Sequence, residues 1–343
     1  MAASAHLGSE VPEHASVGAP GARTRGELHR AIVIGAPVVY AVALIAFVLS
    51  WGLPVARDQL FLWLLLGLAA FSVGAWRSWG AMLLAWLPWL GLLVIYDELR
   101  GAVSVVPADA HVAPQIAVDR WLGGGVAPTE WLQQRLWSPG HLHWYDVAVW
   151  AVYLTHFFAV WLVAAMLWRR SRDRFGRYAV LTIVVTLAAF LAYWRYPSQP
   201  PWLAADLGHL GPVDRIVPLV WDHLGVSSMQ SVYDNASLVN TVAAVPSLHA
   251  AYPLMLLLFF WPAGWAVRAG LGAYSLAMAF ALVYGGEHFV ADILAGWALA
   301  ALAFGAVEVA RRARVLVPGV RPRTSPSTPS ATREIGGATE CQS

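Results

Sequence analysis

Residues 147–194 read VAVWAVYLTHFFAVWLVAAMLWRRSRDRFGRYAVLTIVVTLAAFLAYW. Two apolar runs, 147–168 and 178–194, stand on either side of an arginine-rich tract. A helix that crosses a bilayer needs roughly 20 mostly apolar residues, and arginine is enriched on the cytoplasmic side of membranes. We therefore expect a transmembrane hairpin whose turn faces the cytoplasm.

The same pattern recurs along the chain. The sequence is 59% hydrophobic and 12% charged, whereas a soluble domain carries roughly a quarter charged residues. The sequence therefore predicts an all-α integral membrane protein, a bundle of about eight transmembrane helices. The expected spans are 31–51, 60–76, 79–96, 147–168, 178–194, 247–265, 269–284 and 289–310.

The placement of arginine predicts the orientation. All 22 basic residues are arginine, and with a cytoplasmic N-terminus 16 of them fall on inner segments and 6 on outer ones. We expect a multi-pass protein of the cell membrane with both termini cytoplasmic. By composition, residues 1–27 and 313–343 are expected to be disordered cytoplasmic tails around a transmembrane catalytic domain at 28–312. The one cysteine, Cys341, excludes a disulfide framework or a cysteine-based metal site.

Two connections are much longer than the usual few residues. They are 97–146 and 195–246, and both are expected on the outer side. Each holds a short amphipathic stretch, at 128–137 and at 213–224, of the kind that lies in the membrane interface. Two roles for these expected helices stay open: a lid over polar backbone, and a lateral gate for lipid substrates.

Three polar clusters are expected at one depth of the membrane, at the outer ends of the predicted spans. They read RYPSQPPW at 195–202, PSLH at 246–249 and GGEHFVAD at 285–292. Ionisable residues close to the hydrocarbon region are costly, so such clusters indicate function. We therefore expect the catalytic site on the extracytoplasmic side.

A histidine and an aspartate in the third cluster fit nucleophilic catalysis. His288 and Asp292 are four residues apart and would share one face of a helix. The carboxylate could fix the proton on one ring nitrogen of His288 and leave the other nitrogen to attack. His249, in the second cluster, could give a proton to the leaving oxygen.

The second cluster also predicts an anion site. Pro246 suits the first position of a helix, whose N-terminal N–H groups attract phosphate. Ser247 would add a hydroxyl donor, and Arg195 is placed to neutralise phosphate charge. Together with the two histidines, these groups would serve phosphoryl transfer through a phosphohistidine.

At these motifs the sequence resembles the type-2 phosphatidic acid phosphatase superfamily, in the branch similar to inositol phosphorylceramide synthase. The resemblance covers 96–310 and rests on the stretches 196–202, 246–249 and 288–292. It implies a reaction that needs no metal or other cofactor. It also implies that His288 is the nucleophile, Asp292 its orienting carboxylate and His249 the acid for the leaving group.

The sequence departs from this family where phosphate is bound. Phosphatases of the family carry an arginine six residues before the nucleophile, and this chain has Leu282 there. Trp202 stands at the second basic position of their first motif. The candidates for binding the substrate phosphate are therefore Arg195 and Arg100, the latter in a YDELRG stretch that resembles the synthase-like branch.

Three other polar residues have open roles. His156, inside the fourth span, is expected to make a structural hydrogen bond, with a role in the site as the alternative. Glu287 would contact a polar headgroup or be solvated, and Glu308 would pair with Arg311 or Arg312.

These observations favour a metal-independent lipid phosphotransferase or phosphatase that acts on a lipid-linked phosphate ester at the outer face. The expected partners are that lipid and the membrane, with no nucleic acid; the sequence does not indicate an oligomeric state. One alternative is a metal-dependent membrane hydrolase with His249, His288 and Asp292 as ligands. Another is a non-catalytic lipid transporter.

Overall fold

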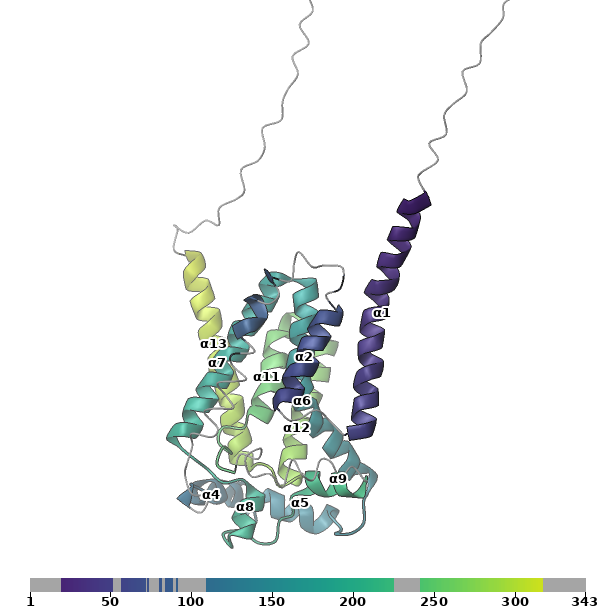
Figure 1. The fold of residues 1–343 in the computed structure, drawn as a ribbon. Coiled ribbons are helices and arrows are strands. Elements are labelled where there is room, and N and C mark those ends of the chain that lie inside the picture. Colours follow the sequence, from purple (N-terminus) through teal and green to yellow (C-terminus); the bar gives the residue numbers. More distant parts are fainter. Residues whose placement is uncertain are drawn as a thin grey trace, which may run out of the picture.

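The computed structural model describes residues 20–51, 57–71, 73, 80–81, 84–88, 91, 109–224 and 241–316. Within these ranges the regular structure is helical, and isolated bridges join His111, Ser198 and Ala243. The helices form an upright bundle with a layer of short helices across one end (Figure 1). The expectation of an all-α integral membrane protein is confirmed.

Five helices of the described part are long and apolar enough to cross a membrane. The arginine tract lies at the turn between α6 and α7, as expected, and Ser171 caps α7 by accepting a hydrogen bond from the N–H of Arg174 at 3.3 Å. The five helices are α1 (Pro20–Trp51), α6 (Trp144–Arg170), α7 (Arg172–Arg195), α12 (Trp265–Tyr284) and α13 (Val290–Leu316).

Other predicted spans differ from the structure. The expected span 60–76 is α2 (Arg57–Phe71), and 79–96 lies mostly outside the described residues. The expected span 247–265 was too long, because the helix there, α11 (Leu248–Phe259), ends at Phe259 and a 3-10 turn follows, η3 (Trp261–Ala263). A proline in this turn cannot extend a helix, and Gly264 has a φ of 107°, a conformation that favours glycine.

The first and last helices extend into the segments 1–27 and 313–343 that were expected to be disordered tails. The helix α1 begins at Pro20 and α13 ends at Leu316; the rest of both tails lies outside the described residues, so the domain division stays a prediction. Near the end of α13, Glu308 accepts a hydrogen bond from Arg311 at 3.1 Å, as expected, and its carboxylate lies 3.5 Å from Arg177 of α7.

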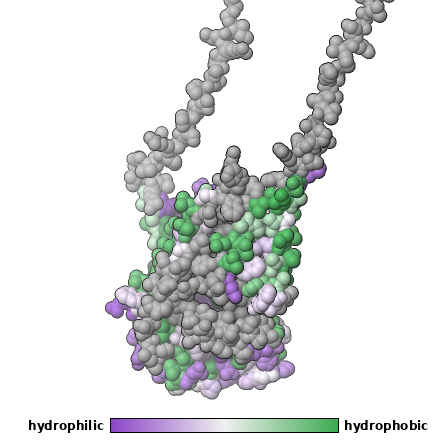
Figure 2. Space-filling model, viewed as in Figure 1, coloured by the Kyte–Doolittle hydropathy of each residue, from purple (hydrophilic) through white to green (hydrophobic). Residues whose placement is uncertain are grey.

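Four short helices form what we call the capping layer: α4 (Ala113–Leu122), α5 (Pro128–Leu136), α8 (Pro201–Asp206) and α9 (Ile216–His223). They gather at the end of the bundle opposite the start of α1 and the end of α13 (Figure 1). In Figure 2 hydrophilic residues gather along this end, while the upper face is mostly hydrophobic. The helices expected at 128–137 and 213–224 are confirmed; α4 and α8 were not expected.

The helix α11 (Leu248–Phe259) is the centre of the bundle. It contacts α7, α12 and α13, and Met255, Leu256 and Phe259 are buried in one apolar cluster with Tyr178 of α7. A helix that is apolar on every side is stable when other helices surround it. This central position fixes the height of His249 in the bundle.

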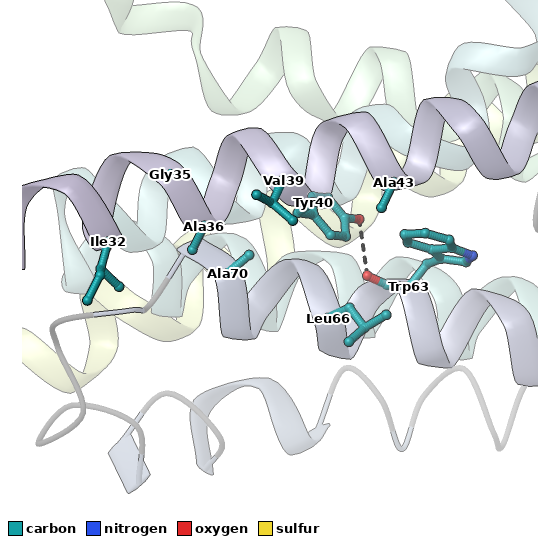
Figure 3. A pocket seen from close by; sticks show the side chains of 9 residues that line it. All are labelled: Ile32, Gly35, Ala36, Val39, Tyr40, Ala43, Trp63, Leu66 and Ala70. Carbon is teal, nitrogen blue, oxygen red and sulfur yellow. Dashed lines mark hydrogen bonds between the residues drawn. The ribbon is translucent and has the colours of Figure 1, made fainter.

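The helix α1 packs against α2 away from this centre. Figure 3 shows Val39 and Tyr40 of α1 and Trp63 and Leu66 of α2 along an apolar groove of about 480 Å³. The Tyr40 hydroxyl donates to the backbone oxygen of Trp63 at 3.1 Å. The groove is lined by none of the residues that the sequence predicts for the site.

A glycine lets α13 approach the start of α11. A Cβ added at Gly296 would lie 2.3 Å from the backbone oxygen of Ser247, closer than real contacts allow. The backbone N–H of Ser247 in turn donates to the backbone oxygen of Asp292 at 3.0 Å. The second and third polar clusters are therefore held together by backbone contacts.

An aspartate of the capping layer binds the start of α13. The carboxylate of Asp119, in α4, accepts hydrogen bonds from the N–H groups of Val290 and Ala291, each at 3.0 Å. The first N–H groups of a helix lack partners within it, and negative charge is favoured there. Burial raises the pKa of Asp119 to about 6, and its bonds to the two N–H groups act in the opposite direction.

The glycine contact is tested by Gly296→Ala. We expect a loss of ~1–3 kcal/mol in the free energy of unfolding, because the added methyl group forces two helices apart. The matched control is Gly305→Ala on the same helix, where no atom lies within 4 Å of an added Cβ. Thermal unfolding in detergent measures both, and equal stability of the two variants would contradict the account.

The buried carboxylate predicts a pH dependence. Since the pKa of Asp119 is raised from 3.8 to about 6 on folding, the folded state binds the proton more tightly, and the stability this gives is lost as pH rises through 6. Asp119→Asn lacks this titration. Thermal unfolding between pH 4 and pH 7 should therefore show wild-type stability falling relative to the variant; a relative rise would contradict it.

Candidate functional site

The three polar clusters meet beneath the capping layer. The N–H of Trp202, from the first cluster, donates to the backbone oxygen of Gly286 in the third cluster at 3.1 Å. The second and third clusters are joined by the contacts of Ser247 with Asp292 and Gly296 described above. The structure thus brings together segments that are far apart in the sequence.

The first cluster has a positioning role. Ser198 is fully buried, and its N–H donates to the backbone oxygen of Val242 at 2.8 Å. Its backbone oxygen and hydroxyl accept from the N–H groups of Ala244 and Val245. The Tyr193 hydroxyl donates to the backbone oxygen of Pro246 at 2.7 Å. These bonds fix the segment that leads into α11.

The second cluster differs from the expected arrangement. The helix begins at Leu248, so Pro246 precedes the helix and Ser247 is its N-cap, with its hydroxyl oxygen accepting from the N–H of Ala250 at 3.3 Å. Serine is favoured at this position because it satisfies a free N–H group. Ser247 is buried, and its role as a phosphate donor stays a prediction.

The third cluster pairs His288 with Asp292. Nδ1 of His288 lies 3.3 Å from Oδ2 of Asp292, which also accepts from the N–H of Phe289 at 2.9 Å. The imidazole precedes the first residue of α13, so the pair closes across the start of the helix and not along its face. Both side chains are buried. A proton on Nδ1 leaves the lone pair of Nε2 available.

The other nitrogen of His288 faces His249. Nε2 of His288 lies 3.4 Å from Nδ1 of His249. The three side chains are therefore connected in the order Asp292, His288, His249, with His288 in contact with both of the others. A phosphoryl group that bonds to Nε2 of His288 would displace this contact and would have His249 beside it as a proton donor.

His156 of α6 borders this site. Its ring centroid lies 3.8 Å from that of His249, and the Tyr153 ring stacks on His249 at 4.9 Å. A structural hydrogen bond was the favoured expectation, but Nδ1 of His156 is buried without a partner among the described residues. The spacing of Tyr153 and His156, three residues apart on one helix, was the available signal.

The two arginines expected to bind phosphate are not among the described contacts of the histidines. Arg195 is exposed at the end of α7, and Arg100 lies outside the described residues; both roles stay predictions. A different cation is near the site. Arg215 forms an ion pair with Glu287 through two bonds of 2.9 and 3.1 Å. Of the two alternatives for Glu287, a solvated side chain is therefore wrong, and a headgroup contact stays a prediction.

In the described ranges, no group of three or more histidine, cysteine, aspartate or glutamate side chains is arranged to hold a metal ion. The two ring nitrogens of His288 face two different partners, Asp292 and His249, at hydrogen-bonding distances. A ligand set would instead converge on one point. The geometry therefore suits a nucleophile with an orienting carboxylate.

Comparison with known proteins agrees with this geometry. The chain is 28% identical over 180 residues to phosphoinositol dihydroceramide synthase of Bacteroides thetaiotaomicron, covering 47% of this chain and 55% of the relative. The match thus spans about half the length of that relative. No solved structure matches the chain. The model of the PAP2 superfamily matches residues 115–306, more than half of the sequence and all of the described site. The chain belongs to the PAP2 superfamily.

Proposed function

We propose that this protein is a metal-independent lipid phosphotransferase or phosphatase that works through a phosphohistidine on His288. The observation that carries the proposal is the connected set of Asp292, His288 and His249, with contacts of 3.3 and 3.4 Å. The family and the relative's name as a synthase support the same chemistry.

The geometry supports two successive transfers. In the first, Nε2 of His288 forms a bond to phosphorus, the bond to the leaving oxygen breaks, and His249 gives that oxygen a proton. In the second, an acceptor hydroxyl gives its proton to His249 and attacks phosphorus, and the bond to His288 breaks. Asp292 keeps the proton on Nδ1 of His288 throughout.

An alcohol is the favoured acceptor. The relative is named for joining phosphoinositol to dihydroceramide, and the phosphatase arginine is replaced by Leu282, which is buried here. Both observations support transfer to a lipid alcohol over hydrolysis. Water would use the same two steps and give a phosphatase.

We also propose that the site faces the extracytoplasmic side of the cell membrane. The capping layer lies at the end opposite the start of α1 and the end of α13 (Figure 1), and its Asp119 binds the start of α13 next to His288. If the arginine-rich turn between α6 and α7 is cytoplasmic, the layer lies outside. Its helices would then lie in the outer interface and admit lipid from the side.

The nucleophile is tested by His288→Ala in detergent. We expect loss of at least about a thousandfold in turnover, because the covalent step cannot occur without the imidazole. His209→Ala, at an exposed residue between α8 and α9 of the capping layer, is the matched control and should keep full activity. The substrates are lipid phosphates and diphosphates with and without inositol, and both product lipid and free phosphate are measured.

Three outcomes of this assay would contradict the proposal. Full activity of His288→Ala would show that His288 is not the nucleophile. Loss of wild-type activity in EDTA would favour the metal-dependent hydrolase. Absence of any lipid conversion by the wild type, together with lipid movement between leaflets, would favour the transporter.

The orientation is tested with the one native cysteine, Cys341, in the C-terminal tail. In cells with an intact plasma membrane, a membrane-impermeant maleimide should leave Cys341 unlabelled until the cells are lysed. The variant with Cys341→Ser and His209→Cys should be labelled before lysis. The reverse pattern would place the capping layer in the cytoplasm.

A further inference from the structure

The two histidines of the site are held in different ways. One ring nitrogen of His288 meets the carboxylate of Asp292, and such a contact fixes the tautomer and the plane of an imidazole. In His249 the outer nitrogen, Nε2, is buried and has no hydrogen-bond partner among the described residues. Its Nδ1 faces His288 at 3.4 Å, but a phosphoryl group on His288 would displace that contact. The orientation of His249 during the reaction must therefore come from the faces of its ring.

Two rings of α6 lie against His249. Its ring centroid is 3.8 Å from that of His156, with the planes 30° apart, and 4.9 Å from that of Tyr153, with the planes 18° apart. Tyr153 and His156 are three residues apart and share one face of their helix. Because protein interiors are closely packed, the imidazole of His249 cannot turn about its Cβ–Cγ bond without moving a ring of α6.

His156 is in turn held by Tyr252, which lies one helical turn after His249 on α11. The ring centroids of His156 and Tyr252 are 5.4 Å apart, with the planes 20° apart. The hydroxyl groups of Tyr252 and of Thr186, in α7, lie 2.7 Å apart and share a hydrogen bond. The four rings of Tyr153, His249, His156 and Tyr252, which we call the ring stack, are therefore tied to a third helix.

His156 contributes the face of its ring to this arrangement. Its Nδ1 is buried without a partner among the described residues, and the shortest of its centroid distances to another ring is the one to His249. The proposed mechanism uses His249 twice, first to give a proton and then to take one, so Nδ1 of His249 must keep one direction through both transfers. A flat side chain against the imidazole fixes that direction while the protonation state changes.

We propose that His156 is a positioning residue that holds the ring of His249 with Nδ1 toward the reacting oxygen; this rests on the proposed phosphoryl transfer at His288. His156 acts through His249 and takes part in no covalent step and no proton transfer. A displacement of a reacting group by about 1 Å can cost about a hundredfold in rate. Loss of the flat ring at position 156 would permit such a displacement.

The test compares two replacements of His156 that both lack the ring nitrogens. His156→Phe keeps a flat ring and should retain kcat within about threefold of the wild type, whereas His156→Leu fills the space without a flat face and should lower kcat at least about tenfold. KM should stay within about twofold in both variants, because the interaction lost acts on the transition state and not on substrate binding. The assay uses purified protein in detergent and a lipid phosphate that the wild type converts.

The matched control is Phe158→Leu, which removes a ring from the same helix at a side chain that is 40% exposed. It should leave kcat and KM unchanged. Thermal unfolding of each variant separates positioning from folding, since leucine and phenylalanine are both favourable within a membrane span. The rates are compared well below the unfolding transition, so that a lower Tm of one variant does not enter the comparison.

Each other outcome has a distinct meaning. Full kcat in both His156 variants would overturn the inference, because no ring would be needed, and an equal loss in both would overturn it by showing that a nitrogen of His156 is required. A change in KM with unchanged kcat would also overturn it. All three leave the role of His288 intact if His288→Ala is inactive.

Failure of the proposed function gives a different pattern. Full activity of His288→Ala, together with loss of kcat in His156→Leu and its recovery in His156→Phe, would contradict the nucleophile and support the positioning of His249. A wild type that converts no lipid phosphate would overturn both the proposed function and the inference.

Discussion

Three successive N–H groups at the start of α13 are bound by two buried carboxylates. Asp292 accepts from Phe289, and Asp119 accepts from Val290 and Ala291. The start of a helix leaves such groups without partners and carries partial positive charge, so carboxylates are stabilised there. Because Asp292 also meets His288, the same arrangement that begins the helix positions the proposed nucleophile.

The turn before His288 depends in the same way on the capping layer. Gly286 has a φ of 74°, and a Cβ there would lie 2.7 Å from the backbone oxygen of Asp214. The backbone oxygens of Gly285 and Gly286 accept from Ile216 and Trp202. The layer that would meet the lipid therefore also fixes the reacting groups before substrate arrives, which is how a site lowers the cost of reaching the transition state.

Local patterns in the sequence predicted the features that depend on neighbouring residues. The apolar runs predicted the long helices, and the spacing of His288 and Asp292 predicted their contact. The contacts that local patterns could not predict join distant segments, such as Arg215 with Glu287, 72 residues apart, and Asp119 with Val290, 171 residues apart. The spacing of apolar and polar residues along the sequence does not predict such pairs, because each pair depends on how the whole bundle packs.

The central claim is that His288 takes the phosphoryl group. The most direct measurement is to mix the protein with a lipid phosphate that it converts, quench the reaction at alkaline pH, where phosphohistidine is stable, and locate the phosphate by peptide mass spectrometry. The account predicts phosphate on His288 within the time of one turnover. Phosphate on another residue, such as His249, or steady turnover without any phosphorylated peptide, would contradict it.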